Sequence, residues 1–65
     1  MKVILNDRQF KIIEVLKRQE SCLTSSEIAK KLSISSKTVQ NEILDINKKY
    51  KKRVIESKKG KGYWL

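Results

Sequence analysis

The sequence predicts a mostly helical α+β domain in which three helices are followed by a small C-terminal β-hairpin. Three polar capping residues each stand just before an apolar stripe of helical spacing, and residues 53–65 combine short apolar segments with two glycines. A chain of 65 residues buries only about 60% of its unfolded surface. We therefore expect a single domain over residues 1–65, with little room for a deep catalytic pocket.

The first helix is expected over about residues 7–19. Asn6 is its N-cap, and Gln9 completes a capping box three residues later. Leu5 and Phe10 occupy the positions of a hydrophobic staple. Apolar residues then cover a wide arc, at positions 10, 12, 13, 15 and 16. So broad an arc indicates a central scaffold helix that is covered on more than one flank.

The second helix is expected over about residues 25–32, where Thr24 and Glu27 form another capping box. Its apolar stripe is short and consists of Ile28, Ala29 and Leu32. Ser33 follows in a tight turn at a position where glycine is common. A left-handed backbone there costs a serine about 1 kcal/mol.

The third helix is expected over about residues 36–49, with Ser35 as its N-cap. At 100° per residue its two faces separate. The core face holds Val39, Ile43, Ile46 and Tyr50, and the opposite face holds Lys37, Asn41, Leu44 and Lys48, with Gln40 and Asp45 at its borders. A short helix, a tight turn and a longer helix with a polar outer face are the helix-turn-helix arrangement, whose second helix enters the major groove of DNA.

The C-terminal segment, about residues 53–65, predicts the hairpin. Val54 and Ile55 are β-branched, and Gly60 and Gly62 can adopt positive φ in the turn before the second strand. A two-stranded hairpin is marginal in water, so it must pack against the helices. Residues 21–23 are placed to add a third short strand, and the resulting order of elements is that of a winged helix-turn-helix.

The formal charge of +9, from 16 basic and 7 acidic residues, favours partners that carry phosphate, nucleic acid first and anionic membranes second. The chain has no histidine and one cysteine, Cys22, so we expect no metal and no cofactor. No nucleophile stands near a base, and no glycine-rich phosphate loop occurs, so we expect no enzyme. With neither a membrane span nor a secretory signal, we expect a cytoplasmic protein without a membrane partner.

Three segments carry a family resemblance: TSSEIAKKL at 24–32, SISSKTVQNEI at 33–43 and GKGYWL at 60–65. Together they resemble the N-terminal winged helix-turn-helix domains of bacterial transcription regulators, above all the antiterminator-like activators of phosphotransferase sugar operons. The DNA-binding domain of the biotin repressor is similar. The resemblance covers about residues 5–65. It implies sequence-specific binding of double-stranded DNA by a domain excised from a longer, usually dimeric regulator.

The resemblance also implies roles for particular residues. The turn that opens the third helix, from Ser35, presents groups to both phosphates and bases. The base-reading candidates are Ser36, Lys37, Thr38, Gln40 and Asn41. The phosphate-contacting candidates are Thr24, Ser26, Lys48 and the wing residues Lys58, Lys59 and Lys61. The backbone amides of residues 24–26 are expected to face a phosphate as well.

Two residues leave alternatives open. Leu44 is apolar on the polar face, where it either touches a thymine methyl group or covers the aliphatic stem of Lys37. Trp64 is expected to be exposed, and to be covered by the rest of a longer chain or by a second copy in a homodimer. If both were instead protein-binding anchors, the domain would be a protein–protein interaction module. An RNA-binding function would need exposed aromatic residues, for which only Trp64 and Tyr50 qualify.

Overall fold

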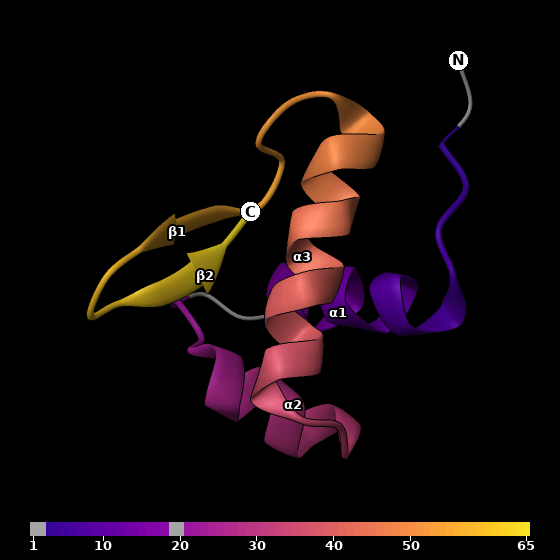
Figure 1. The fold of residues 1–65 in the computed structure, drawn as a ribbon. Coiled ribbons are helices and arrows are strands. Elements are labelled where there is room, and N and C mark those ends of the chain that lie inside the picture. Colours follow the sequence, from indigo (N-terminus) through magenta and orange to yellow (C-terminus); the bar gives the residue numbers. More distant parts are fainter. Residues whose placement is uncertain (1–2, 19–20) are drawn as a thin grey trace.

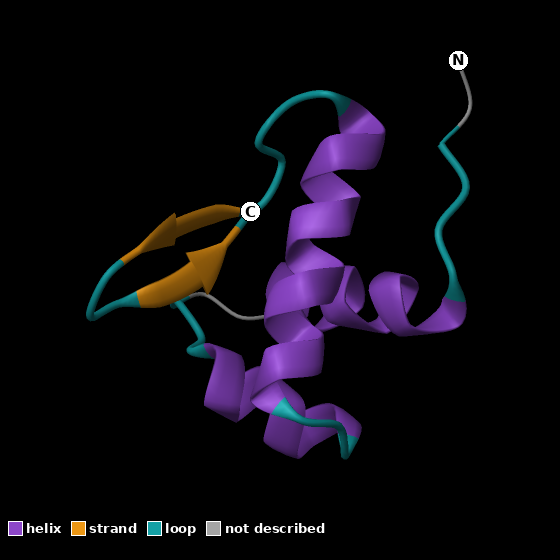
Figure 2. Ribbon diagram, in the orientation of Figure 1, coloured by secondary structure: helices purple, strands orange, loops and turns teal. Residues whose placement is uncertain are grey.

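The computed structural model describes residues 3–18 and 21–65. The elements, in order, are α1 (Asp7–Arg18), α2 (Ser25–Leu32), α3 (Ser36–Tyr50), β1 (Glu56–Lys58) and β2 (Gly62–Trp64). The long α3 begins beside α2 and crosses α1, and the hairpin stands on the other side of α3 from residues 3–6 (Figure 1). Three helices followed by a two-stranded hairpin confirm the predicted winged helix-turn-helix fold (Figure 2). Within the described residues, no helix is long and apolar enough to cross a bilayer.

Capping interactions start all three helices. The Asn6 side chain accepts a hydrogen bond from the Gln9 backbone amide at 2.8 Å, and the Asn6 backbone amide in turn donates to Gln9 Oε1 at 3.3 Å. Thr24 and Glu27 make the same reciprocal pair at 3.2 and 2.9 Å. Ser35 accepts from the amide at the third position of α3 at 3.1 Å. These bonds satisfy amides that otherwise lack an intrahelical partner.

The core lies where the three helices meet. Its buried apolar residues are Ile12, Leu16, Leu23, Ile28, Ala29, Val39, Ile43, Ile46 and Ile55. The core face predicted for α3 is thus buried through Val39, Ile43 and Ile46, while Tyr50 is partly buried against the cluster. Ala29 of α2 is 6% exposed, and its small side chain lets α2 and α3 approach closely.

The predicted arc of α1 was wrong at its first position. Phe10 is 57% exposed, whereas the neighbouring Gln9 is completely buried. Gln9, Ile12 and Leu16 are spaced at i, i+3 and i+7, so they form one stripe that faces the core. Phe10 is rotated about 100° away from that stripe.

The turn between α2 and α3 has the left-handed residue that the sequence predicts. Ser33 has φ 57° and ψ 43°, and the Ile34 amide donates to the Ala29 carbonyl at 3.0 Å. Serine takes the place of the usual glycine at this C-cap. Its left-handed backbone is strained because the Cβ atom lies close to the following carbonyl oxygen.

The hairpin pairs Glu56 with Trp64 and Lys58 with Gly62 in antiparallel register. The third strand expected at residues 21–23 is reduced to one bridge, in which Leu23 and Tyr63 exchange backbone hydrogen bonds of 3.0 and 2.6 Å. Gly62 makes this close approach possible. It has φ +111°, and a Cβ built on it would lie 2.8 Å from the Thr24 nitrogen and nearer still to the Leu23 carbonyl.

Asn47 of α3 fastens the other end of the hairpin. Its side-chain amide donates to the Ile55 carbonyl at 3.2 Å, and its side-chain oxygen accepts from the Ile55 amide at 2.9 Å. Ile55 itself is 1% exposed. The hairpin is therefore held at both ends, to α3 through Asn47 and to the segment before α2 through Leu23.

The expectation of an exposed Trp64 was wrong. Its side chain is only partly exposed, as expected for a residue paired within the hairpin, although it is not among the residues packed on the core. The exposed apolar side chain at this end of the chain is Leu65, at 48%.

Candidate nucleic-acid interface

One face of α3 points away from the protein. Lys37, Asn41, Leu44 and Lys48 are all exposed on it. Val39 and Ile43 on the opposite face are at most 3% exposed. Because the buried face fixes the rotation of the helix, these four side chains are presented together as one stripe, which we call the reading stripe.

Hydroxyl groups cluster at the start of α3. The Ser35 and Thr38 side chains lie 2.7 Å apart, and the Ser35 hydroxyl oxygen also accepts from the Thr38 amide. Whichever hydroxyl donates within this pair, the proton of the other remains available to an outside acceptor. Ser36 is partly buried beside them. The pair is thus rigidly positioned at the end of the reading stripe.

The start of α2 differs in one respect from the prediction. The Thr24 amide is not free for a phosphate, because it donates to the Glu27 carboxylate. That hydrogen bond, together with one between the Thr24 side chain and Glu27, lowers the pKa of Glu27 below its ordinary value of 4.5. The Thr24 hydroxyl oxygen also accepts from the Glu27 backbone amide in the cap. Ser26 is exposed next to it.

Gln40 connects the two helices on the side of the wing. Its side-chain amide donates to the Ser25 hydroxyl at 3.3 Å. Gln40 also lines a hollow of about 500 Å³ whose other walls include Thr24, Ser25 and the hairpin residues Lys58, Lys59 and Lys61. The structure therefore brings three predicted groups to one depression: the start of α2, Gln40 and the wing lysines.

A second hollow adjoins the first and shares Gln40, Ser57 and Tyr63 with it. Its further lining includes Leu44 of the reading stripe and Arg53, which lies between α3 and β1 and is exposed. Arg53 was not among the DNA-contacting residues predicted from the sequence. Its place in a basic run directly after the third helix was the available signal.

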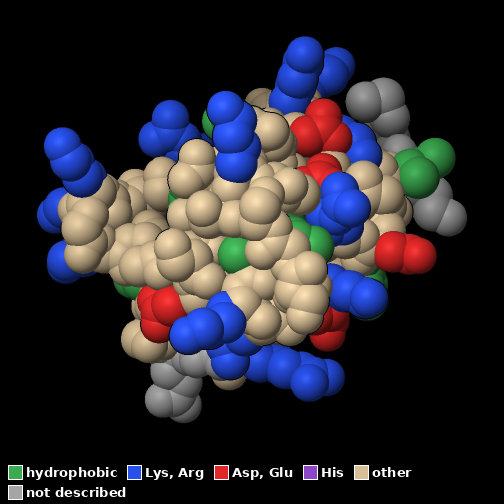
Figure 3. Space-filling view, turned by 60° about the horizontal axis from the view of Figure 1, so that its bottom comes forward, with side chains coloured by type: hydrophobic (Ala, Val, Ile, Leu, Met, Phe, Trp, Pro, Cys, Tyr) green, Lys and Arg blue, Asp and Glu red, His purple; other side chains and the backbone are tan. Residues whose placement is uncertain are grey.

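Basic side chains dominate this part of the surface. Lys58, Lys59 and Lys61 are exposed, and within the described residues none of them forms an ion pair. In the view of Figure 3, lysine and arginine side chains are scattered over the face and along its margins, with a group at the tip of the hairpin on the left. The acidic side chains form smaller, separate spots (Figure 3).

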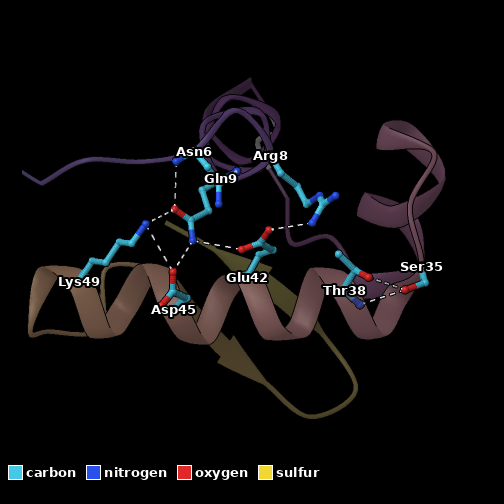
Figure 4. A network of polar contacts seen from close by, with 8 residues as sticks. All are labelled: Asn6, Arg8, Gln9, Ser35, Thr38, Glu42, Asp45 and Lys49. Carbon is cyan, nitrogen blue, oxygen red and sulfur yellow. Dashed lines mark hydrogen bonds and ion pairs between the residues drawn. The ribbon is translucent and has the colours of Figure 1, made fainter.

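A polar network on the flank of α3 ties that helix to α1 (Figure 4). The buried Gln9 donates to Glu42 at 3.1 Å and to Asp45 at 2.6 Å. Its side-chain oxygen accepts from Lys49 at 2.7 Å and from the Asn6 amide at 3.3 Å. One glutamine thus satisfies both its donor protons and both its acceptor positions.

Charges in this network are balanced locally. Arg8 pairs with Glu42 at 3.2 Å, and Lys49 pairs with Asp45 at 3.5 Å. The pKa of Asp45 is lowered below its ordinary value of 3.8, and the main cause is the hydrogen bond that Gln9 donates to it. The positive charge of Lys49 also lowers this pKa. The lowered pKa favours the ionised form of Asp45, and the carboxylates of Glu42 and Asp45 each have a cation beside them.

The comparisons with known proteins agree with this geometry. A protein-family model described as an HTH domain, that is, helix-turn-helix, matches residues 8–64. The chain belongs to this helix-turn-helix domain family. No curated protein and no solved structure matches it significantly.

In this helix-turn-helix domain, α2 and α3 form the motif, α1 supports both, and the hairpin is the wing. Domains of this family bind DNA and are typically not enzymes. The reading stripe belongs to the second helix of the motif, the element that enters the major groove in such domains.

Proposed function

We propose that this helix-turn-helix domain binds double-stranded DNA sequence-specifically, with α3 in the major groove. The observation that carries the proposal is the exposed stripe of Lys37, Asn41 and Lys48 on a helix whose opposite face is buried. A major groove about 12 Å wide admits such a helix. The wing then lies against the DNA backbone or in the adjacent minor groove.

Within this proposal, bases are read by short polar side chains near the start of α3. An asparagine can form two hydrogen bonds with adenine, which makes Asn41 the residue expected to contribute most to specificity. The base-reading set is Ser36, Lys37, Thr38, Gln40 and Asn41. The phosphate-contacting set is Thr24, Ser26, Ser35, Lys48, Lys58, Lys59 and Lys61, to which the second hollow adds Arg53.

We further propose that the domain serves a bacterial transcription regulator acting in the cytoplasm. The resemblance of residues 24–32, 33–43 and 60–65 to regulators of phosphotransferase sugar operons and to the biotin repressor supports this assignment. In that setting, the domain is one part of a longer chain, and two copies of that chain form a homodimer. The exposed Leu65 and the partly exposed Trp64 are candidate contacts for the remainder of that assembly.

The roles of base reading and phosphate contact are separable by experiment. Duplexes are selected from a random pool, and affinities for the selected and a scrambled duplex are measured by fluorescence anisotropy. Asn41→Ala should weaken binding to the selected duplex about ten-fold, from about 1–3 kcal/mol per good base contact, and leave the scrambled one nearly unchanged. Lys59→Ala should weaken both equally.

Lys11→Ala is the matched control, because Lys11 is an exposed lysine of α1 that lines neither hollow beside the reading stripe. It should bind both duplexes as the wild type does. If Asn41→Ala and Lys59→Ala also bind like the wild type, α3 and the wing do not contact DNA and the proposal fails.

A further inference from the structure

Leu44 is the apolar exception in the reading stripe. Its side chain is 68% exposed, and it is the exposed large apolar residue of α3. The other apolar positions of that helix are turned toward the core. Leu44 therefore contributes little to folding, and its exposure requires another explanation.

The surroundings of Leu44 indicate what it meets. Asn41 precedes it by three residues and Lys48 follows it by four, so both are neighbours on the same face. Gln40 and Arg53 line the hollow beside it. The surface around Leu44 is thus polar and basic. A ligand that complements it carries negative charge and places one small apolar group against Leu44.

A protein partner fits this neighbourhood poorly. A stable protein interface buries about 800 Å² on each partner. The remaining exposed large apolar residues among those described, Ile4, Phe10 and Leu65, belong to the N-terminal segment, α1 and the last residue rather than to α3. The side chain of Leu44 is a single apolar spot among cations.

We propose that Leu44 contacts the C5 methyl group of a thymine in the major groove, an inference that rests on the proposed DNA-binding function. Thymine is the one base that presents a methyl group there, and apolar side chains recognise it by removing it from water. Three residues of helix rise about 4.5 Å and one base-pair step about 3.4 Å. The thymine therefore lies about one base pair from the base that Asn41 contacts.

The test removes only the methyl group. In the selected duplex, each thymine is replaced singly by deoxyuridine, and affinities are measured for the wild type, Leu44→Ala, Leu44→Met and Ile4→Ala. One replacement should weaken wild-type binding about four-fold, the value expected for burying one methyl group. Leu44→Ala should be insensitive at that thymine, whereas Leu44→Met should keep much of the sensitivity.

Ile4→Ala is the control for loss of an exposed apolar side chain elsewhere, since Ile4 is 78% exposed. It should retain the wild-type response. Equal affinity of the wild type for every deoxyuridine duplex, or full sensitivity in Leu44→Ala, overturns the leucine contact alone. Absence of salt-dependent binding to any duplex overturns the proposed function, and the leucine contact with it.

Discussion

The buried Gln9 should be a main determinant of how α3 is set against α1, and replacing it by methionine tests this. Methionine has nearly the same length and volume but makes none of the side-chain hydrogen bonds of the glutamine amide. The change removes the hydrogen bonds with the side chains of Glu42, Asp45 and Lys49, at 3.1, 2.6 and 2.7 Å, and the one from the Asn6 amide at 3.3 Å. It leaves the Asn6 side chain free to cap the Gln9 backbone amide.

The expected loss follows from the burial of Gln9, which is 0% exposed. Hydrogen bonds to charged groups contribute about 1.5–3 kcal/mol each in net terms. The lower end applies here, because the charged partners are partly exposed and can turn to water. A buried methionine also recovers part of the loss through apolar burial. We expect Gln9→Met to reduce the free energy of unfolding by about 2–3 kcal/mol.

Thermal unfolding followed by circular dichroism measures the effect. For a domain of this size the melting temperature should fall by about 10–20 °C. Lys11→Met, on the exposed side of the same helix, introduces the same residue and should change stability by less than about 0.5 kcal/mol. If Gln9→Met melts within a few degrees of Lys11→Met, the network does not hold α1 to α3 as inferred.

Three further predictions concern stability. Gly62→Ala should destabilise the fold by about 3 kcal/mol, because it strains the backbone and breaks the bridge to the segment before α2. Gly60→Ala is the control: Gly60 has φ +85° but open space around it, so this variant should lose only about 1 kcal/mol. Equal losses of the two variants in chemical denaturation would contradict the close approach at Gly62. Ser33→Gly should gain about 0.5–1 kcal/mol by relieving the left-handed strain, and a lower melting temperature would refute this. Because the pKa of Asp45 is lower in the folded state than in the unfolded chain, protonation of this carboxylate favours unfolding. The stability that the ionised Asp45 contributes should therefore be lost as the pH falls through the ordinary pKa of 3.8 toward the lower pKa of the folded state. NMR titration should show this pKa nearer 3.8 in Gln9→Met, and an unchanged pKa would exclude Gln9 as its main cause.

Local signals in the sequence predict much of this fold. Caps at Asn6, Thr24 and Ser35 act within three residues, so they can be read without knowledge of tertiary contacts. The apolar spacing of α3 likewise depends only on helix geometry, and it predicts both the core face and the exposed face that contains Asn41. The left-handed turn at Ser33 follows from the shortness of the connection.

The rest depends on contacts between distant residues. Gln9 was interpreted as a capping residue, which it is, but its bonds to α3 span 33–40 positions that no local pattern records. The same distant contacts decide which side of α1 faces the core. They bury Gln9 and leave Phe10 exposed. The partial burial of Trp64 and the place of Arg53 beside the reading stripe depend on how the hairpin docks. That docking is set by the bridge at Leu23, a long-range pairing.

The salt dependence of DNA affinity tests the central claim most directly. If Lys48 and the three wing lysines each contact one phosphate, a plot of the logarithm of the association constant against the logarithm of salt concentration should have a slope of about −3.6, from about 0.9 per contact. Anisotropy titrations of the selected duplex at several salt concentrations measure it. A slope near zero would show that these lysines release no counterions from DNA, and would contradict the account.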